Sequence, residues 1–93
     1  MKLKMFTVHD SKAEAYLHPF TMRSKGEAIR AFSNTVNSPE TQFSKHPGDY
    51  TIFEIGEFDE ETGTLIPHQS KISLGCAIEH KKTPDLAILS QQN

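Results

Sequence analysis

The first residues of the chain alternate between charged and apolar side chains, which is the two-residue period of a β-strand. Residues 2–9 read KLKMFTVH. One face of this strand is predicted to carry Leu3, Met5 and Thr7, and the other Lys2, Lys4, Phe6 and Val8. Asp10 and Ser11 then indicate a turn.

The segment after this turn allows two interpretations. SKAEAY resembles the start of a helix, but Pro19 would break a helix that continued. We therefore predict a strand over residues 16–23, with Tyr16, His18, Phe20 and Met22 on one face. Because proline lacks a backbone donor, Pro19 places this strand at an edge or at a bulge.

The stretch SKGEAIRAFSNTVNSP predicts one short helix with a defined start and end. Ser24 is a favourable N-cap, and Glu27 three residues later completes a capping box. Apolar residues at helical spacing form a stripe for the core, namely Ala28, Ile29, Phe32 and Val36. The helix is predicted to end near Asn37, because Pro39 disfavours helical geometry in the residue before it.

The second half of the chain has the pattern of a loop followed by strands. Residues 38–49 predict a long loop, which Phe43 attaches to the core. Residues 50–58, YTIFEIGEF, are the strongest strand prediction because they are aromatic and β-branched. The remaining predicted elements are an acidic turn over residues 59–64 with Gly63 at positive φ, a strand over residues 64–68 that Pro67 ends or kinks, and a strand over residues 71–80 with a bulge at Gly75.

The order strand, strand, helix, strand, strand, strand predicts the α+β class. We expect a small antiparallel sheet of about four to five strands with one helix packed on one face. At 93 residues the chain fits one domain, which we place at residues 1–82. Residues 83–93 are predicted to be a frayed tail or a short docked helix. A small sheet leaves edges that need cover, so we also expect a homo-oligomer.

Charge is unevenly distributed along the chain, although the net formal charge is only −2. Residues 1–30 carry +3, residues 31–70 carry −6 and residues 71–93 carry +1. Two interpretations stay open. One is the ordinary scatter of surface charge, and the other is a local positive potential that attracts an anionic ligand despite the negative total.

Catalytic and metal-binding residues do not occur in the patterns that such sites require. The five histidines are not spaced as metal ligands, and Cys76 is the single cysteine, so we expect neither a metal site nor a disulfide. Carboxylates run together at residues 59–61, where a solvated turn is the ordinary outcome. Without a nucleophile or nucleotide motif, we expect no catalytic residue, no cofactor and no enzyme activity. No apolar segment is long enough for a signal peptide or a membrane span, so we expect a cytoplasmic protein without a membrane partner.

The remaining candidate site is a basic surface interleaved with aromatic rings in the first third of the chain. Cations hold the phosphates of single-stranded nucleic acid while flat rings stack on its exposed bases. We predict that Lys2, Lys4, Arg23, Lys25 and Arg30 contact phosphates, and that Tyr16 and Phe20 stack on bases. Each ring has the alternative role of packing in the core. No recognised nucleic-acid-binding module matches the sequence.

Three stretches resemble a known family: MKLKMFTVHDSKAEAYLHPF, GEAIRAFSNTVNSPETQFSKHPGDYTIFEIGEFD and SLGCAIE. They are similar to the small nonstructural protein of gokushoviruses, which are microviruses with small circular single-stranded DNA genomes. The resemblance spans about residues 1–80. It implies a DNA-associated protein that acts in the switch from double-stranded replicative forms to single-stranded genomes and their packaging. It implies no catalytic residues and supplies no map of DNA contacts.

The residues and the resemblance together predict a phage protein of the host cytoplasm that binds single-stranded DNA without strong sequence preference. Its expected partners are single-stranded DNA, further copies of itself, and the replication or packaging proteins of the phage. The alternative is a protein-interaction factor that contacts the replication initiator or the procapsid without touching DNA. Such a factor would use a large exposed apolar patch or the acidic turn at residues 59–61.

Overall fold

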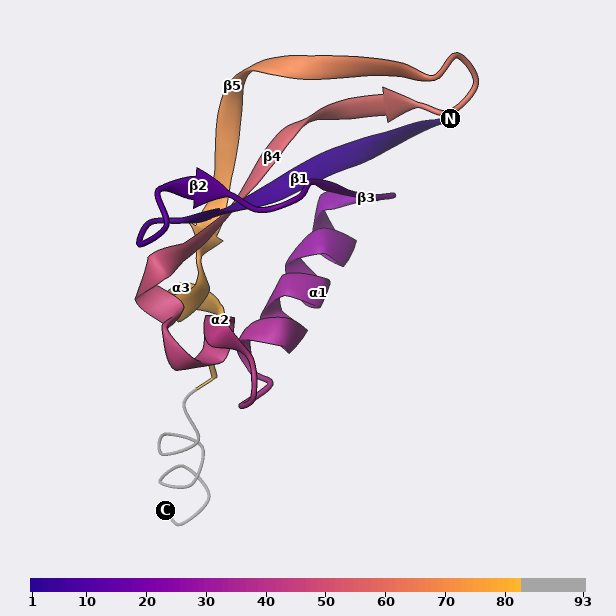
Figure 1. Cartoon of the computed structure of the whole chain (residues 1–93). Helices are drawn as coiled ribbons and strands as arrows, with labels where there is room; N and C mark the ends of the chain where they lie inside the picture. Colours follow the sequence, from indigo (N-terminus) through magenta and orange to yellow (C-terminus); the bar gives the residue numbers. More distant parts are fainter. Residues whose placement is uncertain (83–93) are drawn as a thin grey trace.

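The computed structural model describes residues 1–82, and the predicted C-terminal tail lies outside them. The elements are, in order, strands β1 (Lys2–Asp10), β2 (Ala15–Tyr16) and β3 (Phe20–Met22), helices α1 (Lys25–Val36) and α2 (Gln42–Lys45), a 3-10 helix η1 (Pro47–Asp49), strands β4 (Tyr50–Asp59) and β5 (Thr64–Cys76), and helix α3 (Ala77–His80). All strand pairs are antiparallel, and α1 lies along one side of the sheet (Figure 1). The predicted α+β class is confirmed.

The sheet has the strand order β2-β1-β4-β5, and β3 pairs with β1 on the same side as β2. One edge is therefore the long strand β5, and the other consists of two short strands. β1 pairs with β4 over its whole length, from Lys2 opposite Asp59 to Asp10 opposite Tyr50. This register places the basic start of the chain beside the acidic end of β4.

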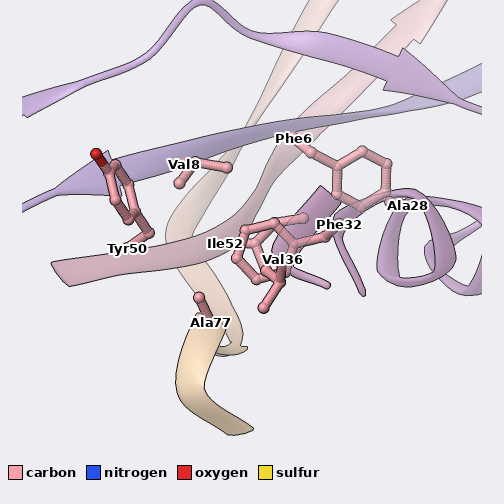
Figure 2. Close-up of a cluster of buried hydrophobic side chains, with 8 residues drawn as sticks. All are labelled: Phe6, Val8, Ala28, Phe32, Val36, Tyr50, Ile52 and Ala77. Carbon is pink, nitrogen blue, oxygen red and sulfur yellow. The ribbon is translucent and has the colours of Figure 1, made fainter. Parts of the chain in front are cut away.

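One buried cluster joins the sheet to the helices (Figure 2). The strands contribute Phe6, Val8, Tyr50 and Ile52, α1 contributes Ala28, Phe32 and Val36, and α3 contributes Ala77. Phe43 of α2 packs against the same cluster, as predicted for the segment that contains it. The three helices therefore share one face of the sheet, and no helix within residues 1–82 covers the other face.

Helix α1 begins and ends where the local sequence predicts. Ser24 Oγ accepts a hydrogen bond from the backbone N–H of Glu27 (3.2 Å), and the Glu27 carboxylate accepts one from the N–H of Arg23 (3.2 Å). At the other end, the Asn37 side chain donates to the carbonyl oxygen of His80 (3.1 Å). The end of α1 is thereby tied to α3, which fixes the helix against the sheet.

The second predicted strand is in fact two short strands, β2 and β3, and both lie at an edge of the sheet, one of the two positions predicted from Pro19. Tyr16 pairs with His9, and Phe20 pairs with Phe6. His9 and Phe6 are three positions apart in β1, so they point to opposite faces of the sheet, and so do their partners. The prediction that Tyr16 and Phe20 share a face is therefore wrong.

Strand β5 is one bent strand where the sequence predicted two, and Figure 1 shows its sharp bend. Pro67 pairs with Gly56 and Ile72 pairs with Glu54, so the residues between Pro67 and Ile72 bulge out of the ladder. The bulge includes His68, whose Nε2 lies 2.7 Å from Oε2 of the buried Glu54. This contact covers a carboxylate that would otherwise lie buried without a partner.

Two segments predicted as loop or strand are helical instead. The predicted loop over residues 38–49 contains α2, which Thr41 caps, and η1. Residues 77–80 form α3 rather than the end of a strand, because the Glu79 carboxylate accepts a hydrogen bond from the backbone N–H that begins the helix (2.8 Å). The predicted bulge at Gly75 is confirmed, and its φ is +114°.

Candidate nucleic-acid interface

Four of the predicted phosphate-binding cations lie together where the N-terminus of α1 meets β1. Lys4 stands opposite Met22 in the β1–β3 ladder, and the chain then passes through Arg23 and Ser24 to Lys25, the first residue of α1. We call Lys2, Lys4, Arg23 and Lys25 the basic corner. Lys4 is half-buried and the other three are exposed. The positive end of the helix dipole adds to the potential of these charges.

The register of β4 brings carboxylates to the same corner. Lys2 is opposite Asp59, and Lys4 is opposite Glu57. None of the four cations forms an ion pair within residues 1–82, so each remains available to a phosphate group. The separation of charge along the sequence is nevertheless reduced in space, because the acidic middle of the chain lies beside its basic start.

An apolar groove of about 320 Å³ adjoins the basic corner between β3 and α1. Its lining includes His18, Phe20 and Met22. Phe20 is half-buried and stacks on Phe6, with ring centroids 5.6 Å apart and an interplanar angle of 27°. Since Met22 lines the groove and also stands opposite Lys4, the cations and the groove meet at this residue.

Arg30 lies apart from the basic corner. It follows Lys25 by five positions, which turns its side chain about 140° around the helix axis. Ala28 and Phe32 are the buried positions of this part of α1, and Arg30 is exposed on the side away from the sheet. The structure therefore brings together four of the five predicted cations.

Tyr16 lies on the opposite face of the sheet from the groove. Its ring centroid is 4.6 Å from that of His9 and 6.1 Å from that of Phe53, and Nζ of Lys71 lies 5.5 Å from it. A second groove, of about 350 Å³, runs beside this ring. Tyr16 is 47% exposed, so it offers a stacking surface, but Lys2 and Lys4 point to the other face of the sheet.

The neighbours of Tyr16 in the structure, His9, Phe53 and Lys71, were not predicted from the sequence. The contact of Tyr16 with His9 could have been predicted from the turn between them. Asp10 Oδ1 accepts hydrogen bonds from two backbone N–H groups of the following turn (3.0 and 3.2 Å), and a turn of this kind favours pairing of the residues that flank it. The other two come from β4 and from the bulge in β5, and no local signal predicts their contact with the ring.

Within residues 1–82, no three His, Cys, Asp or Glu side chains come together as a potential metal site. The pKa of Tyr50 is raised above its ordinary value of 10.0, first by burial and then by the nearby carboxylates of Asp10 and Asp49.

Among the described helices, none has the length and hydropathy needed to span a membrane.

Comparison with protein families matches the description "Phage ORF5 protein" to residues 3–80. The matched residues include β1 from Leu3 onward, the start of α1, the groove and both long strands that follow. Searches among curated proteins and among solved structures gave no match.

Proposed function

We propose that this chain, which belongs to the Phage ORF5 protein family, is a non-enzymatic phage protein that binds single-stranded DNA without strong sequence preference. It acts in viral genome replication and in the switch to single-stranded DNA synthesis and packaging, in the cytoplasm of the host cell. The resemblance to gokushovirus nonstructural proteins supports this role. The observation that carries the proposal is the basic corner beside an apolar groove that contains a half-buried ring, Phe20.

The basic corner supplies the contacts to phosphate. Each cation that binds a phosphate releases condensed counterions, so the logarithm of the binding constant falls with the logarithm of salt concentration, by about 0.7 per contact on single strands. Four cations predict a slope of about −3. The carboxylates of Asp59 and Glu57 across the ladder oppose part of this potential, so we expect moderate affinity that is sensitive to salt.

The groove supplies the contact to a base. Phe20 is held in place by its stacking on Phe6, so its orientation is set before a ligand arrives. A base that enters beside Phe20 and His18 exchanges water for apolar and aromatic surface, which is worth about 1–3 kcal/mol per stacked base. Because every base has a flat face, such a contact accepts any sequence.

Fluorescence-polarisation titrations of short single-stranded and duplex oligonucleotides, each at low and at high salt, test the proposal. For Arg23→Ala/Lys25→Ala we expect about tenfold weaker binding to every single strand and a salt slope flatter by about 1.4. The matched control is Lys12→Ala/Lys45→Ala, which removes the same charge from exposed positions outside the corner. It should bind within about twofold of the parent chain.

Equal losses in the two double variants would indicate that binding follows net charge alone and would reject the corner as a site. Unchanged binding of Arg23→Ala/Lys25→Ala at low salt would reject it as well. A preference for duplex over single strands would reject the proposed class of ligand.

A second candidate function is a protein-interaction factor that contacts the replication initiator or the procapsid without binding DNA. The acidic tip of the β4–β5 hairpin favours it, since Glu60 and Glu61 are exposed there. Glu61 is 83% exposed, with its carboxylate 3.5 Å from the N-terminal ammonium group of Met1. Calorimetry with the purified initiator or capsid protein should then give binding that Glu60→Gln/Glu61→Gln abolishes, while the parent chain leaves single-stranded DNA unbound.

A further inference from the structure

The ends of β1, β4 and β5 form a three-stranded arm with two unlike faces. Directly opposite residues of antiparallel strands point to the same face, so the register defines rows across the arm. One face carries the rows Leu3–Phe58–Leu65 and Met5–Gly56–Pro67, and the other carries Lys2–Asp59–Thr64 and Lys4–Glu57–Ile66. The first face is apolar throughout, and the second contains the charged residues of these rows.

The apolar side of the arm continues toward the middle of the sheet. A groove of about 320 Å³ lies there, with Met5, Pro19, Ile55 and Leu65 among its lining residues. Pro19 and Ile55 also line the groove beside Tyr16. We call the surface made of Leu3, Met5, Ile55, Phe58, Leu65 and Pro67 the apolar face. Leu65 is 60% exposed, and no helix within residues 1–82 covers this face.

We propose that the apolar face is the surface on which a second copy of this chain packs, so that two sheets meet face to face. Leu65 and Pro67 are exposed and the other four residues of the apolar face are half-buried. A contiguous apolar surface of this kind, without charged side chains, marks an interaction site rather than a solvated surface. Two sheets with apolar inner faces pack in this way in β-sandwiches. The inference does not depend on DNA binding, because Lys2 and Lys4 of the basic corner point to the opposite side of the sheet.

The charges at the two ends of this side of the sheet favour a second copy and select its direction. One end borders the acidic hairpin tip, which holds Glu60 and Glu61, and the other end holds Lys71 over the ring of Tyr16. If the strands of two copies run antiparallel across a twofold axis, each acidic tip lies toward the partner's Lys71. Parallel packing would bring two acidic tips together. The surface is therefore complementary to itself in one orientation.

The available area suits a dimer that dissociates on dilution. The whole side of the sheet, from the apolar face to the ring of Tyr16, is about four strands wide at a spacing of ~4.8 Å and about eight residues long at a rise of ~3.3 Å. These dimensions give roughly 500 Å² per copy. The total of roughly 1,000 Å² lies at the lower limit of specific interfaces. We therefore expect a concentration-dependent dimer rather than an obligate one.

Sedimentation equilibrium of the full chain over a series of concentrations tests the proposal. The parent chain should change from monomer to dimer as its concentration rises. Leu65→Lys places a charge on the apolar face, at a side chain exposed in the single copy, so the fold is kept while the dimer dissociation constant rises by about tenfold or more. Ile78→Lys is the matched control, because Ile78 of α3 is an apolar side chain of equal exposure (59%) away from this face.

Circular dichroism checks that both variants fold. The dimer should also persist in high salt, where binding to single-stranded DNA is lost, and this difference separates the present proposal from the proposed function. A monomer at every concentration would overturn the proposal, because a second copy would then not be the partner of the apolar face. Equal effects of Leu65→Lys and Ile78→Lys on dimerisation would overturn it too.

Discussion

Lys2 and Lys4 point to one face of β1, and Leu3 and Met5 point to the other. Arg23, which follows β3, and Lys25, the first residue of α1, stand next to these lysines along the chain and the ladder, and the result is the basic corner beside a groove. On the other side no described helix packs on the apolar rows of the arm, where Leu65 is 60% exposed. One alternating strand, covered on one side alone, thus provides a surface suited to a charged ligand and a surface suited to an apolar partner.

The largest effect is expected from removing the anchor of α1, the helix that makes the two sides unlike. Phe32 is 4% exposed, and its ring centroid lies 5.6 Å from that of Phe43 and 5.5 Å from that of His80. Phe32→Ala should lower the free energy of unfolding by about 3–5 kcal/mol, which is a large part of the stability of a domain of this size. Urea unfolding followed by circular dichroism measures the loss.

The matched control for this variant is Ile78→Ala, at a side chain that is 59% exposed. It should change the free energy of unfolding by less than about 0.5 kcal/mol. Similar losses in the two variants would contradict the view that α1 is held by the cluster of Figure 2.

An intermediate effect on DNA binding is expected when the two rings that lie on opposite faces are each replaced by leucine. Phe20→Leu keeps an apolar side chain against Phe6 but removes the flat ring from the groove, so binding to single-stranded DNA should weaken by about 1–2 kcal/mol, or about five- to thirtyfold. Tyr16→Leu should leave the affinity within about twofold of the parent. Fluorescence polarisation measures both, and the reverse ranking would move the binding site to the face of Tyr16 and Lys71.

The smallest effect is expected on the free energy of unfolding at alkaline pH, and it comes from Tyr50. Because the pKa of Tyr50 is raised in the folded protein, the unfolded chain loses this proton at a lower pH than the native protein does. The stabilising contribution of the neutral hydroxyl is complete below the ordinary pKa and is lost as the pH rises through the raised value. Urea midpoints at neutral pH and at about pH 10.5 should therefore show a smaller alkaline decrease for Tyr50→Phe than for the parent.

The exposed ring of Tyr16 supplies the control for this measurement. Tyr16→Phe should show the same alkaline decrease as the parent chain. If the decrease in Tyr50→Phe also equals that of the parent, the burial of Tyr50 does not set the alkaline stability.

The elements that depend on neighbouring residues were predictable from the sequence. Helix α1 starts at its Ser24 cap and is capped at Asn37, two residues before Pro39, because these signals act within one helical turn. Gly63 in the hairpin turn has a φ of +72°, as predicted, because glycine tolerates the positive φ that the turn requires. The bend in β5 was not predictable, because it depends on the contact of a buried Glu54 with a residue of another strand.

The candidate site also combines features that the sequence predicts with features that it does not. Four cations converge because β3 leads directly from the ladder into α1, an order that the sequence already indicates. Tyr16 and Phe20 were expected to act together, but the register of two separate strand pairs sends them to opposite faces. Lys2 and Lys4 stand opposite carboxylates for a similar reason, since the pairing of β1 with β4 joins segments about fifty residues apart.

We propose that single-stranded DNA binds the side of the sheet that α1 covers and leaves the apolar face free. Backbone-amide NMR spectra of the full chain, recorded during titration with a short oligothymidine, locate the bound strand residue by residue. We expect the largest shift changes on residues 2–6 and 20–25, with residues near Leu65 and Lys71 little changed. Shift changes concentrated around Tyr16, Phe53 and Lys71 would contradict it.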